Sequence, residues 1–204
     1  MGPLDTAGRR AELRAEMRAR RAGLDEDDQA AASMAVLARI ARLAVVRGAR
    51  VVSGYRAVRG ELDVDAVLFL LAEKGITVTT PRVRGEHLEF VVTSENTPVA
   101  TGPFGISEPA GGEIVAVTSH DVMLIPLVAF DANGRRLGQG GGYYDRALGP
   151  VRGLQLGDRP ALVGVAHSFQ QVVEVPSESW DVPLDAVVTE EGVVDVTGGV
   201  ADRA

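Results

Sequence analysis

The chain has 204 residues, 46% of them hydrophobic, with a formal net charge of −7 and no cysteine. That length is enough for one substantial core, so we expect a single domain over residues 1–204, with ragged ends and its structured part at about 9–191. The composition excludes disulfides, thiolate metal sites and cysteine nucleophiles, and the acidic balance argues against nucleic-acid binding. Without a long apolar stretch or a hydrophobic signal core, we expect a cytoplasmic protein with no membrane partner.

The first part of the chain is predicted to form two helices. Residues 7–22 are rich in Ala, Arg, Glu and Leu, which favour a helix, and Gly23 ends it. Asp25 is expected to cap a second helix. Its predicted apolar face consists of Met34, Leu37, Ile40, Ala41 and Ala44. Residues 1–50 carry ten arginines against seven acidic residues, so this basic segment can meet an anionic ligand, although a solvated helix face explains most of these charges equally simply.

The rest of the chain is predicted to alternate strands with helices. The expected order is a strand at 49–54, a loop at 55–61, a helix from Glu61, strands at 76–80 and 87–93, and an irregular loop at 94–113. A strand at 122–125, a helix at 143–148 and strands at 161–165 and 187–189 follow, and the tail from Gly192 shows little pattern. This alternation predicts an α/β fold: a layered domain with a mainly parallel sheet flanked by helices, in a Rossmann-like three-layer arrangement.

The most informative stretch is residues 124–148, LIPLVAFDANGRRLGQGGGYYDRAL. A short apolar run leads into a turn, two arginines, a cluster of glycines, two tyrosines and an aspartate. The backbone N–H groups of such a loop can approach an anion closely, because glycine has no side chain in the way. Arg135 or Arg136 can add positive charge and Asp145 can hold a cation, as phosphoryl transfer requires. The spacing fits neither a P-loop nor a dinucleotide fingerprint, and the glycine count alone leaves a flexible loop as the alternative.

Two further features are candidates from their pattern. Arg10, Arg14 and Arg18 recur every four residues and form one basic stripe, whose simplest role is a solvated face paired with neighbouring glutamates. Glu61, at the predicted start of a helix, is by itself most simply a first-turn acid favoured by the helix dipole.

The glycine-rich stretch as a whole resembles the signature of the 5-formyltetrahydrofolate cyclo-ligase family, also called methenyltetrahydrofolate synthetases. That signature reads Pro, a hydrophobic pair, Phe-Asp, Gly-x-Arg-Leu-Gly-x-Gly-x-Gly-Tyr-Tyr-Asp, and this chain matches it from Pro126 through Asp145. Four other stretches match in the family's order: residues 10–14, 60–63, 104–109 and 171–190. The similarity spans about residues 9–191.

The resemblance implies an enzyme that uses ATP and Mg²⁺ to cyclise 5-formyltetrahydrofolate to 5,10-methenyltetrahydrofolate, releasing ADP and phosphate. It implies catalytic roles for Arg136, Glu61 and Tyr143, and metal ligands at Asp145 and Asp181. The implied ATP contacts are Arg10, Arg14, Arg136, Leu137, Gly138, Gln139, Gly140, Gly141, Gly142, Tyr143 and Tyr144. The implied folate contacts are Arg56, Glu61, Gln139, Gly140, Gly141, Gly142 and Tyr143. We expect a monomer whose partners are these small molecules.

Two other functions remain open at this point. A sugar-phosphate isomerase on a similar layout would need no ATP. A non-catalytic folate- or nucleotide-binding regulator is left open by departures from the family pattern at Arg10, Gly141 and Trp180. Such a regulator would bind 5-formyltetrahydrofolate without releasing phosphate.

Overall fold

The computed structural model describes residues 6–201, and the expected irregularity of residues 1–5 and 202–204 lies outside the described residues. The helices are α1 (Thr6–Ala22), α2 (Glu26–Ile40), α3 (Ala44–Arg47), α4 (Asp65–Glu73) and α5 (Tyr143–Ala147). The strands are β1 (Val51–Ser53), β2 (Thr77–Arg84), β3 (His87–Val92), β4 (Val99–Thr101), β5 (Ser107–Pro109), β6 (Ile114–Val115), β7 (Val122–Pro126), β8 (Ala129–Phe130), β9 (Arg136–Leu137), β10 (Ala161–Val165), β11 (Ala186–Val188) and β12 (Val193–Asp195). Short 3₁₀ helices occur at Val117–Ser119, Gly149–Val151 and Ser168–Gln170.

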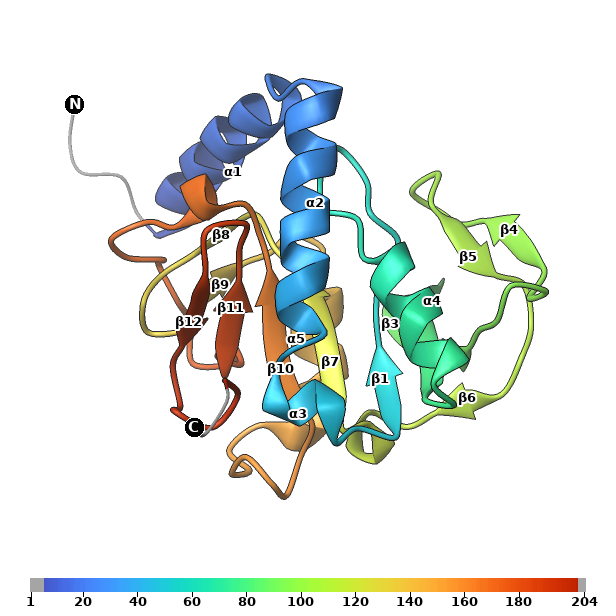
Figure 1. Ribbon diagram of the computed structural model, residues 1–204. Helices are drawn as coiled ribbons and strands as arrows, with labels where there is room; N and C mark the ends of the chain where they lie inside the picture. Colours follow the sequence, from blue (N-terminus) through green and yellow to red (C-terminus); the bar gives the residue numbers. More distant parts are fainter. Residues whose placement is uncertain (1–5, 202–204) are drawn as a thin grey trace, which may run out of the picture.

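An eight-stranded sheet forms the middle layer, in the order β12-β11-β10-β7-β1-β2-β3-β6. The strands β11, β10, β7, β1 and β2 pair in parallel, and β12, β3 and β6 extend the edges in antiparallel fashion. Figure 1 shows α2, α3 and α4 in front of this sheet and α5 behind it. The prediction of a layered α/β fold with a mainly parallel sheet is therefore confirmed.

Strand β7 shows how the sheet divides the core in two, because successive side chains of a strand point to opposite faces. Val122 and Leu124 pack in the layer that holds α2 and α4, whereas Met123 and Ile125 pack on the other face with Leu148, just after α5. The whole strand up to Ile125 is buried. A strand covered on both faces reads as a continuous apolar run, which is why the sequence located it well.

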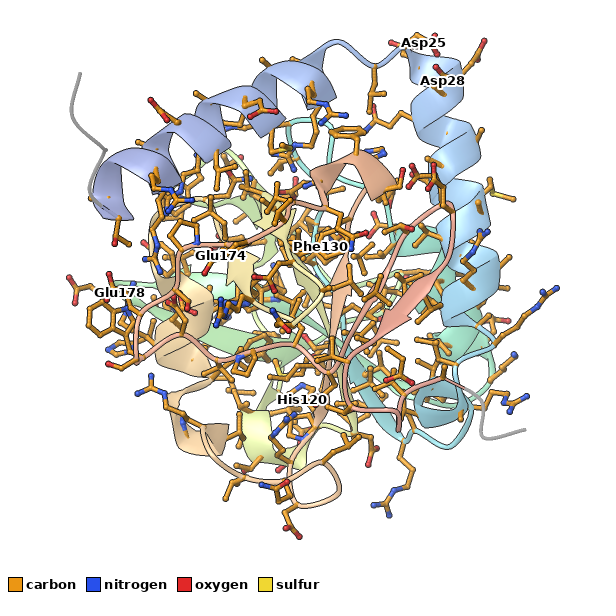
Figure 2. The ribbon with its side chains drawn as sticks, turned by 90° about the vertical axis from the view of Figure 1, so that its left-hand side faces the viewer. Asp25, Asp28, His120, Phe130, Glu174 and Glu178 are labelled. Atoms are coloured by element: carbon orange, nitrogen blue, oxygen red, sulfur yellow. The ribbon has the colours of Figure 1, made fainter. Side chains whose placement is uncertain are left out.

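Asp25 caps α2 as predicted. The backbone amide of Asp28 donates a hydrogen bond to Asp25 Oδ1 at 2.7 Å, and Figure 2 shows both residues at the upper end of the helix. Three acidic residues stand in the first turn, where the positive end of the helix dipole stabilises them. The start of α2 is thus fixed by local chemistry.

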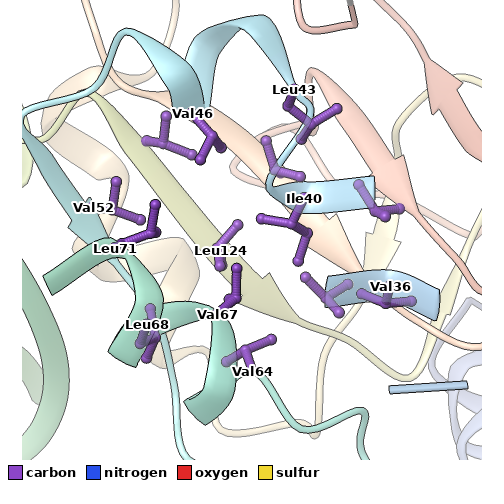
Figure 3. Packing of buried hydrophobic residues seen from close by; sticks show 14 of the residues in the cluster. Val36, Ile40, Leu43, Val46, Val52, Val64, Val67, Leu68, Leu71 and Leu124 are labelled. Atoms are coloured by element: carbon purple, nitrogen blue, oxygen red, sulfur yellow. The ribbon is translucent and has the colours of Figure 1, made fainter. Parts of the chain in front are cut away.

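The buried face of α2 differs from the predicted one. Ala32, Val36 and Ile40 are buried at intervals of four residues, whereas Met34 is 64% exposed. Figure 3 shows Val36 and Ile40 in the same layer as Val67 of α4. The predicted face was correct at Ile40 and Leu37, which pack in the core, and wrong at Met34. The face of a helix is decided by the elements it packs against.

Three further predictions of secondary structure were wrong. The third helix begins at Asp65, so Glu61 lies in the turn before it. Residues 94–113 contain the β4–β5 hairpin, whose strand β4 is exposed throughout and therefore carries no hydrophobic alternation to detect. The tail after Gly192 contains β12, a short, half-buried edge strand that owes its conformation to pairing with β11.

Strands β1 and β7 lie side by side, but the chain leaves them in opposite directions across the sheet, from β1 to β2 and from β7 to β10. Open α/β sheets bind ligands outside the carboxyl ends of their strands at such a switch point. The loops that follow β1 and β7 begin there, and in Figure 1 both arrows point to the end of the molecule where α1 lies. Within residues 6–201, no helix is long and apolar enough to cross a membrane.

The observed face of α2 generates a direct test. We expect Val36→Ala to lower the free energy of unfolding by about 2 kcal/mol, because two buried methyl groups are lost from a packed layer. Met34→Ala on the exposed face should change it by less than about 0.5 kcal/mol. Urea denaturation of the two variants measures both values, and a larger loss for Met34→Ala would contradict this register.

Candidate functional site

A cavity of about 300 Å³ opens at the switch point. Four segments supply most of its lining: the loop after β1, the adjoining parts of β2 and β3, the β4–β5 hairpin, and the glycine-rich loop with the start of α5. Pro126 at the end of β7 and Arg136 on β9 complete it. The lining residues are Tyr55, Arg56, Val58, Arg59, Glu61, Pro81, Val83, Leu88, Phe104, Ile106, Glu108, Pro126, Arg136, Gly138, Gln139, Gly141, Gly142, Tyr143, Tyr144 and Asp145. Segments far apart in the sequence thus contribute to one wall.

The carbonyl groups of the glycine-rich loop are held by arginines. Gly138 O accepts from Arg14 Nε at 2.9 Å, Gln139 O from Arg18 Nη2 at 3.0 Å, and Gly141 O from Arg146 Nη2 at 2.9 Å. Since the N–H and C=O of one trans peptide group point in opposite directions, the amides of residues 139, 140 and 142 point away from these arginines. None of those three amides donates a hydrogen bond to another residue of the described chain. Unpaired N–H groups on a fixed loop are what an anion site offers.

Helix α1 brings positive charge to this loop. Burial, and after it the charges of Arg10 and Arg18, lowers the pKa of Arg14. A guanidinium nevertheless remains protonated at neutral pH, so like charges stand together beside the loop. A bound anion would relieve this repulsion. The arginine stripe predicted from the sequence therefore both holds the loop and concentrates positive charge beside it.

Arg136 and Asp145 form an ion pair within the cavity wall. Arg136, on β9, is only 6% exposed, and its Nη1 and Nη2 both donate to Asp145 Oδ1 at 2.8 Å. Asp145 Oδ2 accepts no hydrogen bond from the residues that the structure describes. The donor set fits Mg²⁺, which takes one or two carboxylates and completes its shell with phosphate oxygens and water. In residues 6–201 no cluster of three or more His, Asp or Glu could hold a metal by itself.

Glu61 faces the same cavity from the loop after β1. Its Oε1 accepts from Gln139 Nε2 at 2.9 Å and its Oε2 from the amide of Val58 at 3.2 Å. Arg21 Nη1 lies 3.5 Å from Oε1. Burial raises the pKa of Glu61, and the hydrogen bond from Gln139 and the charge of Arg21 oppose that rise only in part. A carboxylate in this position can accept N–H groups of a ligand.

Aromatic side chains form the remaining wall. Phe104 on the hairpin meets Tyr143 edge to face, with ring centroids 5.7 Å apart. Gly142 has φ +66°, a left-handed conformation that lets the chain turn directly into α5 and places Tyr143 opposite the hairpin. The hydroxyl of Tyr144 is buried and has no partner among the described residues, so it can donate to a ligand. These rings suit a flat heterocycle.

Most of the predicted site residues come together in this cavity. Its lining includes Arg56, Glu61, Arg136, Gly138, Gln139, Gly141, Gly142, Tyr143, Tyr144 and Asp145. Predicted residues outside the lining are Arg10, Arg14, Leu137, Gly140 and Asp181. Arg14 acts on the loop from behind, and Gly140 belongs to the loop itself.

Two predicted roles meet a different environment. Leu137, expected at ATP, places its side chain in the core with Met17 and Val128, because β9 pairs with β8 beneath α1. Asp181, expected at the metal, pairs with Arg10 Nη2 and also accepts from the amide of Glu178 at 2.8 Å. That ion pair ties the C-terminal segment to α1, away from the lining of the cavity.

Sequence reasoning missed three contributors. Glu108 accepts from the amide of Val83 at 3.1 Å and so holds the hairpin against β2. Tyr55 lines the cavity and donates to Leu62 O at 2.7 Å. Arg21 follows Arg18 by three residues in the same basic helix, and no pattern in the sequence distinguishes a buried arginine from an exposed one.

An open, doubly wound sheet with a ligand cavity at its switch point and an anion-accepting glycine loop defines a ligand-binding α/β protein. The model of the 5-formyltetrahydrofolate cyclo-ligase family matches residues 6–190, and the chain belongs to this family. The match confirms the resemblance seen in the glycine-rich signature.

Individual relatives agree over nearly their full length. A 5-formyltetrahydrofolate cyclo-ligase of Haemophilus influenzae is 33% identical over 181 residues, covering 86% of this chain and 95% of the relative. One of Escherichia coli strain K12 is 32% identical over 182 residues, with 87% and 98% covered. The solved 5,10-methenyltetrahydrofolate synthetase of Aquifex aeolicus has a TM-score of 0.79 at 32% identity, with 96% of each chain covered. That of Mycoplasma pneumoniae, 24% identical with a TM-score of 0.71 and covering 89% of this chain and 98% of its own, supports the fold alone.

The environment of Glu61 predicts an unusual titration. In a ¹³C NMR titration of carboxyl-labelled protein, the Glu61 signal, assigned by its loss in Glu61→Gln, should have a midpoint above the ordinary range for glutamate, because burial disfavours the charged form. A midpoint within or below that range would contradict the burial described for this carboxyl.

Proposed function

We propose that this protein catalyses the ATP- and Mg²⁺-dependent cyclisation of 5-formyltetrahydrofolate to 5,10-methenyltetrahydrofolate, with release of ADP and phosphate. The observation that supports it most is that one cavity holds both a glycine loop with unpaired amides and the buried carboxylate Glu61, joined by Gln139. A triphosphate and a folate could therefore lie next to each other.

The chemistry suits a site that positions reactants without a covalent nucleophile. An amide oxygen is both a poor nucleophile and a poor leaving group. When the formyl oxygen attacks the γ-phosphorus of ATP, ADP leaves and the oxygen becomes a phosphate ester. N10 then attacks the formyl carbon, the five-membered ring closes, and the ester oxygen departs with phosphate. The protein must hold two anionic substrates and stabilise charge that moves during transfer.

Different residues are proposed to bind the triphosphate and the folate. The loop amides from Gly138 to Gly142, with Arg136, bind the triphosphate, while Arg14 keeps the loop in place. Glu61 accepts N–H groups of the folate, and Arg56 assists at the cavity wall. Tyr143 packs against the folate ring system with Phe104, and the Tyr144 hydroxyl donates to whichever substrate lies over it.

Magnesium is assigned to Asp145, whose Oδ2 is available in the cavity wall. When bound, the ion supplies positive charge to the phosphate oxygens. Asp181 is committed to Arg10, so the proposal gives it the role of anchoring Arg10 and assigns the direct metal contact to Asp145 alone. The protein is proposed to act as a cytoplasmic monomer on small molecules, without nucleic-acid or membrane partners.

The reaction can be followed directly. Purified protein with 5-formyltetrahydrofolate should produce the near-ultraviolet absorption of the methenyl product only when Mg·ATP is present, with one phosphate released per product. Binding of 5-formyltetrahydrofolate without phosphate release would favour the regulator, and ATP-independent turnover of a sugar phosphate would favour the isomerase.

Substitutions of Arg136 and of its neighbour Arg135 can be compared directly. We expect Arg136→Met to lower kcat by at least about 100-fold, the scale seen when one donor to a developing charge is removed. Arg135→Met should stay close to wild type, because Arg135 lies on the surface beside Glu174. Equal losses in the two variants, with both folded by circular dichroism, would contradict the role of Arg136.

The metal role has its own test. Asp145→Ala should lower kcat by orders of magnitude and raise the Mg²⁺ concentration needed for half-maximal rate, because the one carboxylate of the site is lost. Near-normal turnover of Asp145→Ala at saturating Mg·ATP would remove Asp145 from the metal site.

A further inference from the structure

Arg21, in the last turn of α1, is buried, and its side chain makes no hydrogen bond to the residues that the structure describes. The side chain is 0% exposed, and the lack of a hydrogen bond extends to all of Nε, Nη1 and Nη2. The acidic group paired with it is Glu61, whose Oε1 lies 3.5 Å from Arg21 Nη1. Buried arginines are ordinarily held by several hydrogen bonds, so this one is not explained by packing.

The turn that carries Glu61 is shaped against Arg21. Gly60 has φ +76°, and a Cβ at this position would lie 3.2 Å from Arg21 O and 3.3 Å from Arg21 Cβ. Only glycine combines that backbone conformation with such a close approach. His167 Nε2 lies 3.1 Å from Gly60 O and supports the turn from the other side. The backbone before Glu61 is therefore fixed relative to Arg21.

The main effect of Arg21 on Glu61 is electrostatic. Burial favours the protonated form of a carboxyl group, and a fixed cation at ion-pair distance favours the ionised form. The charge of Arg21 lowers the pKa of Glu61 against the larger effect of burial. An aliphatic side chain would fill the same space without that effect.

We propose that Arg21 is a positioning residue that keeps Glu61 ionised and aimed into the cavity, so that both of its oxygens can accept N–H groups of the folate. A protonated Glu61 would present an O–H where the ligand presents donors, and one of these contacts would become repulsive. This inference rests on the proposed folate contact of Glu61. It does not involve the triphosphate or Asp145.

Other groups also face this pair, and their influence has to be separated from that of Arg21. The hydroxyls of Tyr55 and Tyr144 and the carboxylate of Asp63 lie near the cavity side, and His167 with Glu190 lies on the side of Arg21. Arg18 acts through Gln139. Burial raises the pKa of both tyrosines, so these two stay neutral over the range where Glu61 titrates. Burial also lowers the pKa of His167.

The test compares Arg21→Met with Arg21→Lys. In Arg21→Met we expect KM for 5-formyltetrahydrofolate at pH 7 to rise at least about tenfold, equivalent to about one pKa unit of lost preference for the ionised form. KM for ATP should stay near wild type. The acid limb of kcat/KM for the folate should move to higher pH by about one unit or more, because Glu61 without the cation holds its proton longer. Arg21→Lys, which keeps the charge, should restore most of the wild-type profile.

A partly buried, ion-paired arginine serves as the control. Arg159 pairs with Asp185 at 2.6 Å and does not line the cavity. Arg159→Met should lower the melting temperature yet leave the acid limb in place, which separates general destabilisation from an effect on Glu61. If Arg21→Met fails to fold, Arg21→Gln removes the charge and keeps hydrogen-bonding capacity, and the same shift is expected.

The outcomes distinguish this inference from the proposed function. If the wild type forms the methenyl product while Arg21→Met or Arg21→Gln keeps the wild-type acid limb and folate KM, the inference is overturned and the function stands. If the wild type shows no turnover, the midpoint of the Glu61 titration, measured by ¹³C NMR, still tests the inference. A higher midpoint in Arg21→Met but not in Arg21→Lys supports the inference, and an unchanged midpoint in Arg21→Met overturns it.

Discussion

The hydrogen bonds from arginine side chains to the carbonyls of the glycine-rich loop are the constraint on which the site depends. A loop of glycines has little preference of its own, and each peptide group could turn either way. Arg14 and Arg18 of α1 hold two consecutive carbonyls, and Arg146 of α5 holds a third. The direction of the carbonyls fixes the direction of the amides, so the proposed anion site needs no rearrangement of these peptide groups when a ligand binds. Preorganisation of this kind is where polar sites gain most of their effect.

The same helix controls the other half of the cavity. Arg18 also binds the side chain of Gln139, which in turn donates to Glu61, and Arg21 stands behind that carboxylate. One face of α1 therefore connects the glycine-rich loop with the buried acidic group of the cavity. Two members of the basic stripe of α1, Arg14 and Arg18, contact the glycine-rich loop, and the third, Arg10, is paired with Asp181 outside the cavity.

The sequence predicted the parts of the fold that local chemistry decides. The cap at Asp25, the apolar run of β7 and the glycine signature each carry their own signal, and the signature also revealed the family. The face of α2 was misjudged because Met34 and Val36 differ in burial only through what α2 packs against. The β4–β5 hairpin has an exposed strand without alternation, and β12 is an edge strand defined by its neighbour.

The residues of the site divide in the same way, into those with a local signal in the sequence and those without one. Residues inside a continuous motif, such as Arg136 and Tyr143, were predicted together because their spacing is fixed along the chain, and both line the cavity. Arg21 was missed because the carboxylate beside it, Glu61, lies about forty residues away in the sequence, and an arginine in a basic helix looks like its solvated neighbours. Asp181 was placed at the metal by resemblance, whereas the structure gives its carboxylate to Arg10.

The contacts of α1 also have a consequence for the order in which the molecule takes shape. Arg14 reaches a carbonyl 124 positions later in the chain, and Arg10 reaches partners 166 and 171 positions later. During synthesis Arg14 cannot make this contact before residue 138 has emerged, and Arg10 cannot make its contacts before residues 176 and 181 have emerged. The entropy of closing such long loops slows the formation of these contacts. Competence to hold ligands would thus arise as the last event of folding, so a partly made chain could have most of its sheet and still lack a working centre.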